Sequence, residues 1–127
     1  LIEIDPNNDR VYQQLIDLYY KQNKTSQANT ALDQILSLYQ RQDPPKALEL
    51  LNSLVINYPE DMVLRQRLAI AYVQNGLTED AIAAYDALGE MQLEQGLRLE
   101  AAQTIQAILN LNPSDPEGYQ TLLAQIR

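Results

Sequence analysis

The sequence predicts an all-α protein, an α-solenoid of about seven antiparallel helices. Apolar residues recur at intervals of three and four throughout, and no stretch alternates with a period of two over the length of a strand. Three prolines, Pro6, Pro59 and Pro113, stand 53 and 54 residues apart and are followed by similar sequence. Self-similarity at a fixed period is typical of stacked helical units. Loops of only a few residues favour antiparallel neighbours.

The internal repeat is carried by residues at equal distances behind these prolines. A leucine lies nine residues after each proline, and an apolar residue of similar size lies four residues further on. The pairs are Leu15 and Tyr19, Leu68 and Tyr72, and Leu122 and Ile126. We therefore expect one helical-repeat domain over residues 1–127, with units at residues 6–58, 59–112 and, in part, 113–127.

The first helix is predicted at residues 8–22, because Asn23 tolerates the left-handed conformation of a helix stop. Its inward residues are expected to be Val11, Leu15, Ile16, Leu18 and Tyr19. The second helix is predicted at residues 25–41, with the same spacing in Ala28, Leu32, Ile35, Leu36 and Tyr39. A third, at residues 44–57, follows Asp43 and two prolines, a pattern typical of a helix N-terminus.

The fourth and fifth helices are predicted at residues 61–75 and 78–95. Gly76 ends the fourth helix. Thr78 is expected to cap the fifth, with acidic residues in the first turn, where the helix dipole favours negative charge.

The sixth and seventh helices complete the predicted array. Gly96 separates the fifth helix from a sixth at residues 97–110. The seventh opens at Pro116, because Ser114 and Glu117 have the spacing of a capping box around that proline.

These spacings resemble the tetratricopeptide repeat, a 34-residue helix–turn–helix unit with aromatic, small and proline residues at set positions. One set of matching residues is Leu68, Ala69, Tyr72, Gly76, Ala81 and Tyr85. A second is Tyr12, Leu15, Tyr19, Asn23, Ala28 and Leu32, and a third is Tyr85, Leu88, Gly89, Gly96, Ala101, Ile105 and Pro113. The resemblance implies a right-handed superhelix that binds proteins or peptides.

One feature departs from the two-helix unit of that family. Tyr85 serves both as the second aromatic of one repeat and as the first aromatic of the next, so the fifth helix belongs to two overlapping repeats. The period is therefore expected to be three helices in 53 or 54 residues. An odd number of helices in each unit argues against a simple concave groove on one side.

Composition narrows the possible partners. The chain has no cysteine or histidine, which removes disulfides, imidazole bases and the usual zinc ligands, and we expect no cofactor. Seventeen acidic against nine basic residues give a net charge of −8, which disfavours nucleic acid as a partner. No apolar run is long enough to cross a membrane. We expect a soluble protein, with the cytoplasm favoured, although the redox compartment stays open.

Partner-binding residues follow from the resemblance, because family members bind peptides on the face made by first helices. On the first helix these positions are Gln13, Asp17, Tyr20 and Lys21, and on the fourth they are Gln66, Ile70, Val73 and Gln74. The alternative is that they are only solvated. Asp17 and Ile70 stand where a clamp for a C-terminal carboxylate would have asparagine, so that subclass is not expected.

A second candidate is the acidic stripe Asp86, Glu90 and Glu94, which lie four residues apart on the fifth helix. Like charges at this spacing cost a few tenths of a kcal/mol per pair. The stripe is consistent with docking of a basic segment, but an ordinary solvated face on an acidic protein is the favoured interpretation.

Catalysis is not expected. No Gly-rich phosphate loop or calcium loop is present, and Asp86 with Glu90 on a convex helix face has no pocket to shift a pKa. The leading hypothesis is therefore a protein-interaction scaffold. The alternatives are a structural or oligomerisation spacer and a regulatory module of a larger protein.

End-to-end self-association is a further expectation. Leu1 to Pro6 resembles the end of the helix that runs into Pro113, so the chain is expected to be part of a longer array. Leu1, Ile2 and Ile4 at one end, and Leu123 and Ile126 at the other, would then be bare apolar surface able to pair.

Overall fold

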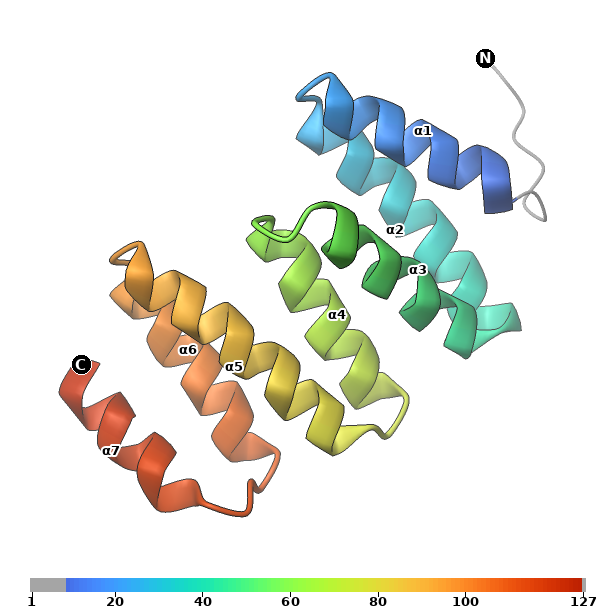
Figure 1. Cartoon of the computed structure of the whole chain (residues 1–127). Helices are drawn as coiled ribbons and strands as arrows, with labels where there is room; N and C mark the ends of the chain where they lie inside the picture. Colours follow the sequence, from blue (N-terminus) through green and yellow to red (C-terminus); the bar gives the residue numbers. More distant parts are fainter. Residues whose placement is uncertain (1–8, 127) are drawn as a thin grey trace. The chain divides into compact units, whose positions relative to one another are not determined.

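The computed structural model describes residues 9–126, which form seven α-helices and no strand (Figure 1). The helices are α1 (Asp9–Lys21), α2 (Thr25–Gln42), α3 (Pro44–Asn57), α4 (Met62–Gln74), α5 (Thr78–Glu94), α6 (Arg98–Asn110) and α7 (Pro116–Ile126). The predicted all-α fold is confirmed, and every helix bound predicted above lies within about one residue of the observed bound.

The chain divides into two compact units, residues 1–47 and 48–127. The first unit holds α1 and α2, the second holds α4 to α7, and α3 crosses the boundary. Helices α1, α4 and α7 begin 53 and 54 residues apart, at Asp9, Met62 and Pro116. The helix starts therefore follow the spacing of the prolines. The organisation as one domain, its superhelical sense and its unit boundaries stay predictions.

Three turns of the same kind connect α1 to α2, α4 to α5 and α5 to α6. Each has a residue with positive φ just after the helix: Asn23 at 61°, Gly76 at 74° and Gly96 at 76°. The next backbone N–H then bonds to a carbonyl five residues back, in the pairs Lys24 to Tyr19, Leu77 to Tyr72 and Leu97 to Gln92, at 2.8, 2.9 and 2.8 Å. These are Schellman stops, as predicted at Asn23 and Gly76.

The connection from α6 to α7 differs from these turns because of a proline. Asn112 also has positive φ, 55°, and its N–H bonds to the Leu109 carbonyl at 3.1 Å. The next residue, Pro113, has no N–H and cannot make the second bond of a Schellman stop. The chain therefore runs on through residues 111–115 before α7 begins.

The helix caps correct two predictions and add one cap that was not predicted. Asp61 caps α4, accepting a bond from the Leu64 N–H at 3.1 Å. Thr78 is wrong as the cap of α5: the cap residue is Leu77, with no side-chain bond, because the tight turn places Thr78 inside the helix. At α7 the capping oxygen belongs to Asp115, which accepts from the Gly118 N–H at 3.4 Å, so Ser114 is wrong as the cap.

In the first unit, α1 packs against α2. All five apolar residues predicted to face inward from α2 are buried, and Ile16 of α1 is fully buried with them. Leu18 is an exception, because its side chain is 49 % exposed although it was predicted to face inward. Within this unit α1 packs against α2, and Leu18 lies outside that contact.

In the second unit, α5 packs against both α4 and α6, and α6 packs against α7. Small residues lie at these contacts: Ala81 and Ala101 are fully buried. The buried Thr104 hydroxyl donates to the Gln92 side-chain oxygen at 2.6 Å, which satisfies the two buried polar side chains between α5 and α6. The double contact of α5 agrees with its predicted place in two overlapping repeats.

Of the apolar residues predicted to pair at the two ends of the chain, only those of α7 belong to the described residues. Leu1, Ile2 and Ile4 lie outside the described residues. Leu123 was predicted to be bare, and this is wrong: it is buried, with 7 % of its side chain exposed. Helix α7 turns this residue toward α6, and Ile126 is half-buried.

Candidate protein-interaction surfaces

The predicted residues of α1 divide into two kinds. Gln13 and Lys21 are exposed, whereas Asp17 and Tyr20 are half-buried. The Tyr20 hydroxyl itself is buried, so this side chain is only partly accessible to a partner. Helix α1 and helix α4 lie in different units, and a groove shared by them stays a prediction.

All four predicted residues of α4 are exposed, and the structure adds Val63 to them. Ile70 is 41 % and Val63 47 % exposed, and Val73 is similar. These residues recur at intervals of three and four, so they share one side of the helix. We call this set, Val63, Gln66, Ile70, Val73 and Gln74, the α4 face.

The opposite side of α4 is the core side. Leu64, Leu68 and Ala71 are buried there, in the unit where α4 packs against α5. Helix α4 is therefore apolar on both sides, whereas a helix at the surface of a globular protein usually has one polar side. The resemblance predicted the other four residues of the α4 face but not Val63, although its spacing from Gln66 and Ile70 places it there.

The repeat supplies an internal comparison for the α4 face. The residues 53 positions earlier, on α1, are Arg10, Gln13, Asp17, Tyr20 and Lys21. The residues 54 positions later that lie on α7 are Glu117, Gln120 and Ala124. Only α4 has three large aliphatic residues and no charge at these outward positions. The apolar character therefore does not follow from the repeat itself.

The acidic stripe is exposed, but one of its members has a partner within the protein. The Tyr119 hydroxyl of α7 lies 3.0 and 2.9 Å from the two carboxylate oxygens of Asp86 on α5. Glu90 and Glu94 are exposed on the same helix. Asp86 thus helps to hold α7 beside α5, a role that the sequence did not indicate.

The environment of Tyr119 is electrostatically negative. Partial burial raises the pKa of the Tyr119 phenol above 10.0, and the hydrogen bond to Asp86 together with the charges of Asp86 and Asp115 raises it further. A neutral hydroxyl is favoured because ionisation would place a third negative charge beside two carboxylates.

A cleft of about 730 Å³ lies next to this pair, between the start of α5, the α6–α7 connection and α7. It is lined by Thr78, Glu79, Ile82, Asn112, Pro113, Ser114, Asp115, Gly118, Tyr119 and Leu122. We call it the α5–α7 cleft. The cleft forms between residues more than thirty positions apart. One indication of it was present in the sequence, because α5 was predicted to serve as the first helix of the overlapping repeat.

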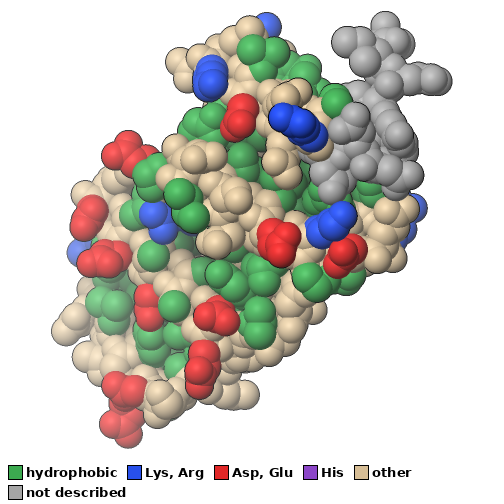
Figure 2. All heavy atoms as spheres, turned by 45° about the vertical axis from the view of Figure 1, so that its right-hand side comes forward, with side chains coloured by type: hydrophobic (Ala, Val, Ile, Leu, Met, Phe, Trp, Pro, Cys, Tyr) green, Lys and Arg blue, Asp and Glu red, His purple; other side chains and the backbone are tan. Residues whose placement is uncertain are grey.

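Further hollows lie elsewhere in the described part of the chain. One, of about 590 Å³, runs along the outer side of α6 with Leu99 and Ile126 in its wall. Another, of about 260 Å³, lies between α1 and α2 beside Leu15 and Tyr19. On the side of the molecule shown in Figure 2, hydrophobic side chains lie exposed between carboxylates, so apolar and acidic surface adjoin.

Comparison with known families decides the relationship. Two sequence models described as tetratricopeptide repeat match the chain, at residues 32–88 and 10–40, and together they cover residues 10–88, more than half of its length. The chain is a tetratricopeptide repeat protein. No match was found among curated proteins or among solved structures.

Tetratricopeptide repeats generally mediate protein–protein interactions and typically act as scaffolds rather than catalysts. The matched residues include α1, α2, α3, α4 and much of α5, and so contain the whole α4 face of this tetratricopeptide repeat protein. The α5–α7 cleft extends beyond them, into α7. None of the helices in residues 9–126 has the length and apolar character needed to cross a bilayer.

Proposed function

We propose that this tetratricopeptide repeat protein is an interaction scaffold that binds a partner protein through the α4 face. The observation that carries the proposal is that Val63, Ile70 and Val73 are exposed on a helix whose opposite side already forms the core. Contiguous exposed apolar residues with polar neighbours are typical of protein-binding surfaces.

The energetics favour a partner that covers this face. Fully burying a valine or isoleucine side chain stabilises by about 1.5–3 kcal/mol, and these three are already partly covered. Covering the exposed part of each of these side chains would contribute roughly 1 kcal/mol to the free energy of binding. Gln66 and Gln74 supply hydrogen-bonding groups beside them without charge. A face of this kind suits an apolar segment with uncharged polar flanks.

The test compares capture of proteins from an extract of the source cells by three forms of the protein. Ile70→Glu with Val73→Glu places two charges on the α4 face. The matched control, Ile56→Glu with Leu99→Glu, places the same charges at residues that are 70 % and 69 % exposed on α3 and α6. All substituted residues are exposed, so circular dichroism should show unchanged helix content.

We expect a protein captured by the wild type and by the control to be lost with the α4 variant. Retention of every captured protein by the α4 variant would show that the face is not the binding surface. Loss of capture of the protein's own chain, and of nothing else, would support the oligomerisation role instead. A photo-crosslinking residue at position 70, with position 56 as the control, identifies the contact directly.

A further inference from the structure

The negative charge of this protein is concentrated in its last three helices. Residues 78–126 contain eight acidic residues and one basic residue, Arg98, a net charge of −7 out of the total of −8. The remaining residues are close to neutral, with nine acidic and eight basic side chains. The two candidate surfaces therefore differ in chemistry: the α4 face is apolar and uncharged, and the α5–α7 cleft lies in the acidic part.

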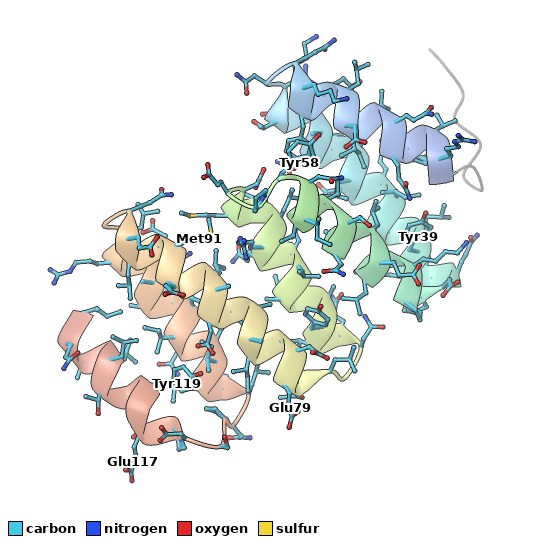
Figure 3. The ribbon with its side chains drawn as sticks, in the orientation of Figure 1. Tyr39, Tyr58, Glu79, Met91, Glu117 and Tyr119 are labelled. Carbon is cyan, nitrogen blue, oxygen red and sulfur yellow. The ribbon has the colours of Figure 1, made fainter. Side chains whose placement is uncertain are left out.

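The α5–α7 cleft combines carboxylates with apolar side chains. Glu79 and Asp115 belong to its lining, together with Ile82, Pro113 and Leu122, and no lysine or arginine lines it. Figure 3 shows Tyr119 lying between α7 and α5, and Glu79 at the start of α5. Glu117 points away from the helices and does not line the cleft.

We propose that the α5–α7 cleft binds a basic segment of a partner protein, by seating a lysine or arginine side chain between Glu79 and Asp115. The aliphatic stem of such a side chain covers apolar surface while its charged end stays at the acidic rim. Ile82 and Leu122 supply that apolar surface. The ring of Tyr119 adds a face that attracts a cation.

The electrostatics of the cleft select for positive charge. The Tyr119 phenol is already influenced by the negative charges of Asp86 and Asp115, so a cation entering the cleft meets several carboxylates at once. Glu79 and Asp115 also lie at helix N-termini, where negative charge stabilises the helix. Acidic residues are common in the first turn of a helix because of this stabilisation, whether or not they bind a partner. The control variant must therefore change acidic residues that lie in a first turn but do not line the cleft.

Asp80 and Glu117 provide this control within the same two helices. Asp80 is in the first turn of α5 and Glu117 in the first turn of α7, and neither lines the cleft. The cleft pair Glu79→Gln with Asp115→Asn and the control pair Asp80→Asn with Glu117→Gln remove equal charge. Asparagine at position 115 keeps a capping oxygen for α7.

The experiment is a titration of the ¹⁵N-labelled full chain, followed by NMR, with the peptide Gly-Ser-Leu-Lys-Leu-Ser-Gly. Matched peptides have norleucine or glutamate in place of the lysine. In about 0.1 M sodium chloride, where the screening length is about 10 Å, we expect the lysine peptide to shift the signals of Ile82, Gly118 and Tyr119, and the other two peptides to leave them unchanged. The cleft pair should weaken binding about tenfold and the control pair no more than about twofold, since distant charges are screened by salt.

Several results would overturn the proposal. They are equal binding of the norleucine peptide, equal weakening by the two pairs of substitutions, shifts that lie outside the cleft, and no binding of the lysine peptide. Ile70→Glu with Val73→Glu should leave the peptide affinity unchanged, and a loss there would assign the peptide to the α4 face. The cleft and the α4 face are thus tested separately, and either can fail without the other.

Discussion

At the scale of single residues, Tyr119 has the most informative contact. Its hydroxyl joins α7 to Asp86 on α5 across 33 positions of sequence. The bond gives α7 a polar attachment in addition to the burial of Leu123. It also holds one carboxylate of the acidic stripe in a fixed place beside the cleft.

Tyr119→Phe should lower the free energy of unfolding by about 1 kcal/mol at neutral pH, because it removes this hydrogen bond and little else. The pKa of the phenol is raised in the folded protein, so its contribution is complete below pH 10, the ordinary value, and is lost as pH rises through the folded value. The difference between wild type and variant should therefore shrink above pH 10. Urea unfolding at pH 7 and pH 11 measures it, and a difference that grows with pH would contradict the assignment.

Asp61 and Thr78 form a second comparison at this scale. Asp61→Ala should cost about 1 kcal/mol of stability, because its carboxylate accepts the Leu64 N–H. Thr78→Ala should change stability by less than about 0.5 kcal/mol, since Thr78 is exposed and is not the cap residue. Urea unfolding of the two variants checks both values. Equal losses would restore Thr78 as a cap.

At the scale of elements, the fold depends on tight turns between helices of similar length. Gly76 and Gly96 adopt the left-handed conformation that ends α4 and α5. Gly89 lies inside α5 and has no such role. Gly76 and Gly96 are therefore needed for their backbone conformation, whereas Gly89 is not.

Gly76→Ala should destabilise the protein by about 1 kcal/mol, because alanine is strained at a φ of 74° although no atom lies within 4 Å of the added carbon. Gly89→Ala should leave stability unchanged or raise it by up to about 1 kcal/mol, because alanine favours the helix and its methyl would lie 3.5 Å from the Thr104 methyl, an ordinary contact. Thermal unfolding of both variants distinguishes the effects. A large loss for Gly89→Ala would mean that α5 and α6 lie closer together than described.

At the scale of the whole molecule, charge is distributed unevenly along the chain. The net charge of −7 in residues 78–126 means that α5, α6 and α7 repel one another while their apolar contacts hold them together. The negative charge is concentrated there because seven of the nine basic residues lie between residues 10 and 67.

The melting temperature should therefore rise with sodium chloride up to about 0.3 M, since salt screens repulsion over distances of about 10 Å or more. Glu90→Gln with Glu94→Gln should raise the melting temperature at low salt and reduce its dependence on salt. Calorimetry at several salt concentrations checks both expectations. A melting temperature that falls as salt is added would show that attractive ion pairs outweigh the repulsion.

Local sequence patterns were enough to predict the helices, their bounds, the stops at Asn23 and Gly76 and the repeat period. These features depend on contacts within a few residues, such as the carbonyl that a Schellman turn reaches or the proline that ends a helix. Four of the five residues of the α4 face were predicted as well, from the resemblance to the repeat family, and their spacing extends to Val63.

The covered apolar residues and the contacts between distant residues became known from the packing of the helices. Leu18 proved exposed and Leu123 buried, because burial depends on where neighbouring helices lie rather than on the period of one helix. The bond between Tyr119 and Asp86 and the cleft beside it depend in the same way on the packing of α7 next to α5 and α6. Such contacts join residues more than thirty positions apart, and no local pattern of sequence specifies them.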